Sequence, residues 1–494
     1  MARDDAAFPN ILLITLDQFR ADCLSCAGHP VVKTPGLDHL AAHGVRLSRH
    51  YSQAAPCSPG RAALYTGTYQ MNNRVVANGT PLDTRLDNIA HAARRAGYVP
   101  ALFGYTDQGV DPRLVSDPTD PRLSTYEGVL PGFDAVLDMS GWQLPWLHWL
   151  NGHGYDFPDP IAALSVEHER RVDLSNSAFL TNAFLGWLGD QSQPWFAHLS
   201  YLRPHPPYSA AGEFSTMYAE QSCPPPMPVP DNRHRLLESL LRSPAAAPTD
   251  PQELAHMQAQ YFGMISEVDA QLARVWAALT DRGDWQNTVI VVTSDHGEQL
   301  GDQGLVQKAG FYESSYAVVG IVRDPRFDTV AVVDEFTENV DIMPTLCEAM
   351  GIDVPAQCDG FPLTPFMRGD TPSVWRDAAY YEWDWRDVFI PLGDHPWPWD
   401  RRLERQNLAV RRSHDRAFVH FGDGSWRCFD LAADPTWQTE ITDASTVLGE
   451  AAAMLSWRSR NLDRTMTGML LQDGGIGRRP QPISMANVGR TRPS

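Results

Sequence analysis

Short apolar runs alternate with longer periodic segments along most of the chain. The runs are rich in Val, Ile, Leu and aromatic residues, which is typical of buried strands, and they lie at 10–17, 98–107, 195–205 and 288–297. Segments with the spacing and end signals of helices lie at 34–44, 87–97 and 251–283. This alternation predicts an α/β fold in which a mixed, mostly parallel sheet is sandwiched by helices.

The pattern changes near residue 376. Short apolar segments separated by turn residues follow at 380–385, 407–413, 416–424 and 425–431, and an amphipathic segment follows at 447–465. Closely spaced strands of this kind favour an antiparallel sheet, and the last segment favours a helix. We therefore predict a main, catalytic domain over 1–375 and a smaller C-terminal subdomain over 376–494, which holds an antiparallel sheet, a helix and a loose or partner-docked tail.

Polar, ligand-capable residues end each of the four apolar runs. They are Asp17, the stretch 105–107, His205, and Asp295 with His296. Because the carboxyl ends of parallel strands meet at one edge of a sheet, we expect these residues to form a functional site there.

Composition and charge narrow the class of protein. With 43% hydrophobic residues, the 494-residue chain can bury a large core, and its net charge of −20 opposes broad contact with nucleic acid. The N-terminus is acidic, and the run at 10–17 is too short for a secretory or membrane-spanning segment. Seven cysteines fit reduced thiols better than a disulfide framework. We expect a cytoplasmic protein without a nucleic-acid or membrane partner.

The sequence CSPGR at 57–61 puts a cysteine in a polar turn directly ahead of a helix-forming segment. An ordinary loop cysteine is one interpretation. A thiolate of the tyrosine-phosphatase type is excluded, because it needs an arginine six positions after the cysteine and this chain has Ala63. Together with the ALYTG that follows, CSPGR resembles the active-site signature of the sulfatases, a branch of the alkaline phosphatase superfamily.

The resemblance implies that a separate maturation enzyme oxidises Cys57 to formylglycine, an aldehyde. Its hydrate carries two hydroxyls on one carbon: one attacks the sulfur or phosphorus of an ester, and the other then releases the covalent adduct by carbon–oxygen cleavage. Arg61, one helical turn after Cys57, is expected to hold the hydrate. The N-terminus of the helix that follows Pro59 is expected to attract the anion.

The resemblance also implies one divalent metal ion, with residue 57 among its ligands. The segment TSDHGEQLGD at 293–302 resembles the second metal motif of the family and makes Asp295 and His296 ligands, while Asp17 matches the first motif. Gln18, near the metal, stands where many sulfatases have a second acid. An imidazole in place of a carboxylate makes the site less calcium-like, so we expect manganese or calcium, with zinc or iron as alternatives.

The combination of Asp17-Gln18 with Asp295-His296 resembles the bacterial phosphonate monoester hydrolases. Similarity to these enzymes continues through YLRPHPPY, NGTPLD, LFGYT, YYEWDWRDVF and LSWRSRNLDRT. It implies that His205 and Lys308 bind the transferred anion and stabilise the leaving oxygen. It also implies that Asn78 and Tyr105 contact the non-bridging ester oxygens or the substituent.

One position departs from that pattern. Asp107 stands where these relatives have threonine, and a carboxylate there repels a second negative substituent. We expect it either to bind a cationic or hydroxylated group or to point away.

The sequence therefore predicts a metal-dependent, formylglycine hydrolase of sulfate monoesters, phosphonate monoesters or phosphodiesters, which forms a homo-oligomer. A phosphomonoesterase of the same superfamily and a non-catalytic binding protein are the alternatives. Cys23 and Cys26 with His29 suggest zinc or redox chemistry, but a second cysteine pair is missing, so we interpret them as packing residues.

Overall fold

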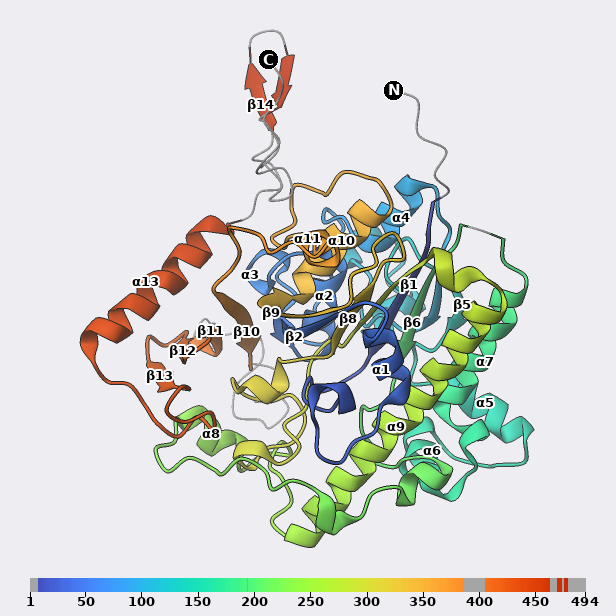
Figure 1. Ribbon diagram of the computed structural model, residues 1–494, viewed down its shortest axis with the longest axis horizontal. Helices are drawn as coiled ribbons and strands as arrows, with labels where there is room; N and C mark the ends of the chain where they lie inside the picture. The colour runs from blue at the N-terminus through green and yellow to red at the C-terminus, as the bar shows by residue number, and fades with distance from the viewer. Residues whose placement is uncertain (1–7, 193, 386–404, 463–468, 473–474, 479–494) are drawn as a thin grey trace.

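An eight-stranded sheet forms the centre of the molecule, in the order β5-β4-β6-β1-β7-β8-β2-β9 (Figure 1). The computed structural model describes residues 8–192, 194–385, 405–462, 469–472 and 475–478. The strands are β1 Asn10–Leu16, β2 Val45–Tyr51, β4 Pro100–Gly104, β5 Asp134–Asp138, β6 Phe196–Tyr201, β7 Thr288–Thr293, β8 Gly320–Arg323 and β9 Ala331–Glu338. Neighbouring strands are parallel except where β8 pairs with β7 and β2. The predicted mostly parallel sheet is confirmed.

Helices cover both faces of this sheet. Leu12 and Ile14 of β1 pack in a core with α1 Pro35–Ala41, α7 Asn176–Gly189 and α9 Pro251–Asp281. Ile11 and Leu13 of the same strand point to the opposite face, into a core with α2 Cys57–Thr66, α4 Ile89–Ala96 and α10 Ile342–Ala349. Because successive strand residues face opposite sides, a strand buried on both faces is apolar throughout, as the run at 10–17 is.

The second sheet has five strands in the order β13-β12-β11-β10-β3. Its C-terminal strands pair antiparallel, as predicted: β10 Ala378–Asp384, β11 Asn407–Ser413, β12 Arg416–Phe421 and β13 Trp426–Asp430. The fifth strand, β3 Ala54–Ala55, comes from the N-terminal part of the chain and pairs parallel with β10. The chain immediately before Cys57 is therefore anchored to the C-terminal sheet.

The predicted C-terminal helix is α13 Ala444–Arg460, which lies at the outer edge of the molecule in Figure 1. It begins three residues earlier than the predicted segment, because the Asp443 side chain accepts a hydrogen bond from the Thr446 N–H and caps the helix. Trp457 of α13 stacks on Tyr380 of β10, with ring centroids 4.6 Å apart.

The remaining α-helices and strands of the described residues are short. They are α3 Gln70–Asn73, α5 Leu144–Gly152, α6 Pro160–Ser165, α8 Arg235–Leu240, α11 Thr364–Met367, and the paired strands β14 Met469–Gln472 and β15 Gly475–Arg478. Residues 479–494 of the predicted tail lie outside the described residues.

All seven cysteines are free thiols, in agreement with the expected reduced state. Within the described ranges, no helix combines the length and the apolar character that crossing a bilayer requires. β4, β6, β1 and β7 are neighbours at the centre of the main sheet, so their carboxyl ends lie side by side.

Candidate active site

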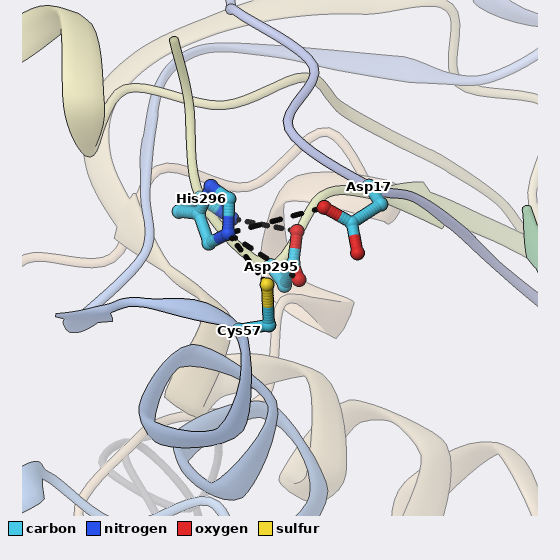
Figure 2. A group of neighbouring side chains, drawn as sticks. All are labelled: Asp17, Cys57, Asp295 and His296. Atoms are coloured by element: carbon cyan, nitrogen blue, oxygen red, sulfur yellow. Dashed lines mark hydrogen bonds and ion pairs between the residues drawn. The ribbon is translucent and has the colours of Figure 1, made fainter. Parts of the chain in front are cut away.

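All four predicted metal ligands meet at the carboxyl edge of the main sheet (Figure 2). Asp17 directly follows β1, Asp295 and His296 lie just beyond β7, and Cys57 is the first residue of α2. One ligand atom from each lies within 4.8 Å of the others, and no side chain in the group is more than 6% exposed. The fold thus brings together residues that are up to 279 positions apart, since the group runs from 17 to 296.

The geometry of this group fits a divalent cation. His296 Nε2 lies 3.2 Å from Cys57 Sγ, 3.7 Å from Asp295 Oδ2 and 3.9 Å from Asp17 Oδ1. His296 Nδ1 is 3.1 Å from the Gly297 carbonyl, which assigns the proton to Nδ1 and leaves the Nε2 lone pair facing the group. Asp17 Oδ1 is buried without a hydrogen-bond partner among the described residues. A buried anionic oxygen of this kind is stabilised by a cation.

Arg61 holds the same carboxylates from the other side. Its Nη2 is 3.1 Å from Asp17 Oδ2, and its Nε is 3.0 Å from Asp295 Oδ2. The guanidinium lies over the Tyr105 ring, 4.5 Å from the centroid, and Nη1 donates to Ser200 Oγ at 2.8 Å. Among the described residues, Arg61 donates to the predicted ligands Asp17 and Asp295 and to Ser200; that it holds the hydrated aldehyde stays a prediction.

Lys308 and His205 form a second group next to the ligands. Lys308 Nζ lies 3.1 Å from His205 Nε2 and donates to Gln18 Oε1 at 2.9 Å. His205 Nδ1 lies 2.7 Å from the Pro206 carbonyl, so its Nε2 accepts from the lysine. Burial and the neighbouring Lys308 lower the pKa of His205 to about 3, so the imidazole is neutral. The two predicted anion-binding residues therefore contact each other, and Lys308 also contacts Gln18, the residue that follows Asp17.

The three predicted substrate-binding residues have partners inside the protein. Asn78 Oδ1 accepts from the Ser58 N–H at 2.9 Å, at the N-terminus of α2. The Tyr105 hydroxyl donates to Asp17 Oδ2 at 2.7 Å.

Asp107 is 5% exposed, and its Oδ2 lies 3.5 Å from Arg61 Nε. Burial raises the pKa of Asp107 well above its usual range even though Arg61 opposes the shift. Asp107 was expected either to bind a cationic or hydroxylated group or to point away; the cationic group that it faces in this structure is Arg61.

The unmodified Cys57 thiol is a poor nucleophile in this environment. Burial, followed by the charge of Asp17, raises the pKa of the thiol well above its usual value. Because the thiolate is the reactive form of cysteine, the site does not favour thiol chemistry.

Two residues of the site were not predicted. The Glu298 carboxylate accepts from Gln18 Nε2 and from the Tyr208 hydroxyl, the latter at 2.9 Å. The sequence could have indicated Glu298 as a site residue, because it lies two positions after His296 within the motif at 293–302. Ser200, which binds Arg61, lies inside the buried strand β6, and no sequence pattern distinguishes it from its neighbours.

Comparison with known proteins covers nearly the whole chain. Residues 9–352 match the family described as Sulfatase, and residues 301–455 match the one described as N-sulphoglucosamine sulphohydrolase, C-terminal. The multifunctional alkaline phosphatase superfamily protein PehA of Trinickia caryophylli is 35% identical over an alignment of 501 positions, which covers 93% of this chain and 96% of that protein. The arylsulfatase of Clostridium perfringens is 26% identical over 88% of this chain and 90% of its own.

A solved structure is also similar. The phosphonate monoester hydrolase of Agrobacterium radiobacter superposes with a TM-score of 0.89 at 40% identity, over 96% of this chain and all of that one. These findings confirm the resemblance predicted from CSPGR and the two metal motifs. The chain is a hydrolase of the sulfatase family, within the alkaline phosphatase superfamily.

Proposed function

We propose that this chain is a metal-dependent hydrolase of sulfate monoesters, phosphonate monoesters or phosphodiesters, and that it uses a formylglycine derived from Cys57. The observation that carries the proposal is the group of Asp17, Cys57, Asp295 and His296 within 4.8 Å, next to Lys308. One relative is named an arylsulfatase and another a phosphonate monoester hydrolase, which supports both classes of ester as substrates.

Asp17, Asp295 and His296 would hold the cation, with residue 57 as a further ligand. When bound, such an ion supplies Lewis acidity toward the ester oxygens and lowers the pKa of a nearby hydroxyl. Two carboxylates and one imidazole suit manganese, with calcium, zinc or iron as alternatives. Arg61 binds Oδ2 of both Asp17 and Asp295, which fixes the two carboxylates and leaves Asp17 Oδ1 without another partner among the described residues and thus available for the cation.

Lys308 and His205 would bind the transferred group. Although burial opposes it, the anionic groups around Lys308 raise its pKa, so the ammonium keeps its charge and its protons. One of those protons is held by the neutral His205 Nε2 and another by Gln18 Oε1, which leaves the third directed elsewhere. That proton is suited to stabilise, or to pass to, the oxygen of the departing alcohol.

The alternatives have less support. A phosphomonoesterase acting on a dianion needs two close cations, whereas the described residues bring together a single group of three or more His, Cys, Asp or Glu side chains close enough to hold a cation. A non-catalytic binding protein would not need all four metal ligands together with Lys308 and His205, yet this chain has the complete set. The proposal also includes two protein partners: a maturation enzyme that oxidises Cys57 to formylglycine, and further copies of this chain in a homo-oligomer.

A mass spectrum of the peptide that spans Cys57 tests the mechanism. After co-expression with a formylglycine-generating enzyme, we expect a loss of about 18 Da relative to the thiol, because –CH2–SH becomes –CHO and so loses one sulfur and two hydrogens and gains one oxygen. The same preparation, assayed with an aryl sulfate, a phosphonate monoester and a phosphodiester, should hydrolyse at least one, and Cys57→Ala should hydrolyse none. An unmodified but fully active Cys57 would remove formylglycine from the proposal.

A further inference from the structure

Glu298 is a buried carboxylate that joins four separate segments around the site. It is fully buried, and its Oε2 accepts from the Tyr208 hydroxyl at 2.9 Å and from Gln18 Nε2. Its Oε1 accepts from the backbone N–H groups of Leu300, at 2.8 Å, and Gln307. Both oxygens are therefore hydrogen-bonded, and every partner is a donor.

This arrangement determines which end of the Gln18 amide faces the site. An ionised carboxylate only accepts hydrogen bonds, so the amide nitrogen of Gln18 must face Glu298. The amide oxygen then faces the opposite way, where it accepts from Lys308 Nζ at 2.9 Å. Lys308 has only donors, so the reverse orientation would place a donor against a donor at both ends of the amide.

The backbone at Gln18 supports the same orientation. Its φ of 69° is in the left-handed region, which a non-glycine residue adopts only when its surroundings hold it there. The Gln18 N–H donates to Asp295 Oδ1 at 3.2 Å, and the Gln18 carbonyl accepts from the Tyr261 hydroxyl at 2.6 Å. Gln18 is thus held from its backbone to its amide, directly after the ligand Asp17.

We infer that Glu298 is a positioning residue that directs the Gln18 amide oxygen toward Lys308 and the cation-binding group. The inference rests on the proposed function, because it gives Glu298 a role relative to the cation. The hydrogen bonds of the Glu298 carboxylate go to none of the four ligands; it acts through Gln18, and through the Gln307 N–H on the loop that carries Lys308.

The variant Glu298→Gln reverses this polarity without changing side-chain size. Oε1 of the new amide must face the Leu300 and Gln307 N–H groups, so its nitrogen faces Gln18. The Gln18 amide then rotates by half a turn and presents its own nitrogen to Lys308. We expect Mn²⁺, measured by calorimetry on the metal-free full-length chain, to bind about 10- to 100-fold more weakly, as for other residues that orient metal sites.

A compensating variant separates orientation from general damage. In Gln18→Glu combined with Glu298→Gln, the new amide donates to the new carboxylate, whose second oxygen again faces Lys308. We expect this double variant to recover Mn²⁺ affinity to within a few-fold of the wild type. The matched control is Glu267→Gln: this carboxylate is equally buried, but it accepts from Ser175 and Ser177, and we expect unchanged Mn²⁺ affinity.

The outcomes distinguish this inference from the proposed function. A wild-type chain that binds no Mn²⁺ or other divalent cation overturns both. Binding by the wild type with equal affinity in Glu298→Gln, or failure of the double variant to recover it, overturns only the role of Glu298. If Glu298→Gln does not fold, Tyr208→Phe decides: removing one of the hydrogen bonds to Oε2 should weaken Mn²⁺ binding about 5-fold, and unchanged affinity overturns the inference.

Discussion

Arg61 Nη2 lies 3.1 Å from Asp17 Oδ2, which ties the helix that begins at Cys57 to the end of the central strand β1. The Arg61 side chain is fully buried, and its Nε makes a second ion pair, with Asp295. One guanidinium therefore joins three elements of the site before any cation binds.

Arg61→Ala should strongly destabilise the metal-free protein. The substitution leaves two carboxylates buried without their partner, and losing one side of a buried ion pair costs about 3–5 kcal/mol of unfolding free energy. Urea unfolding measures the change. Arg85→Ala is the control, because the Arg85 side chain is 79% exposed, and the free energy of unfolding should barely change. Equal stability of the two variants would contradict the role given to Arg61.

Removing the cation should lower the melting temperature, and Mn²⁺ should restore it. A ligand that binds only the folded state stabilises it by about 3 kcal/mol when its free concentration is roughly 100 times its Kd. Thermal unfolding before and after chelation measures this effect. Asp17→Asn should abolish the Mn²⁺-dependent rise, because it removes the charge from an oxygen with no other partner among the described residues.

Glu267 should make stability fall as pH rises. Burial, followed by the charge of Glu167, raises the pKa of Glu267 from 4.5 to about 7. Between these values the folded state keeps a proton that the unfolded state has released, so the stabilising contribution is complete below 4.5 and is lost as pH rises to about 7. The loss is on the order of 3 kcal/mol. Urea unfolding across this range should show it in the wild type but not in Glu267→Gln.

Trp457→Ala should detach α13 from the rest of the protein. The Trp457 ring stacks on Tyr380 at 4.6 Å and meets Tyr69 edge-on at 4.9 Å, so it joins the helix to the C-terminal sheet and to the catalytic part. Truncating a buried aromatic residue costs about 3–5 kcal/mol. Trp426→Ala, on a side chain that is 39% exposed, should have a much smaller effect on urea unfolding.

Asp107→Thr should change the ranking of substrates. Its carboxyl competes for the Arg61 Nε, which also binds the ligand Asp295, and it adds an acidic group beside the site. With that group removed, we expect hydrolysis of an aryl phosphate monoester, which carries a second negative charge, to gain relative to hydrolysis of the singly charged aryl sulfate, as kcat/KM ratios will show. An identical ranking in both proteins would mean that Asp107 has no part in specificity.

The sequence by itself determined the central strands and most of the chemistry at their ends. The runs that became β1, β4, β6 and β7 were recognisable because a strand buried on both faces must be apolar along its whole length. The rule that parallel strands present their carboxyl ends at one edge then grouped Asp17 with Asp295 and His296, although it could not supply a distance.

Only the tertiary structure decided how these residues are held. Arg61 binds carboxylates that follow two different strands, and Glu298 orients an amide 280 positions away. Residues of β3 pair with residues of β10 that lie 328 positions later in the chain. Such contacts leave no periodic trace, because they depend on the register and spacing of elements that meet only after folding. The pattern of apolar and polar positions that predicts a strand or helix lies within a few neighbouring residues. The hydrogen-bond partner of a buried polar group, in contrast, depends on how the whole chain packs.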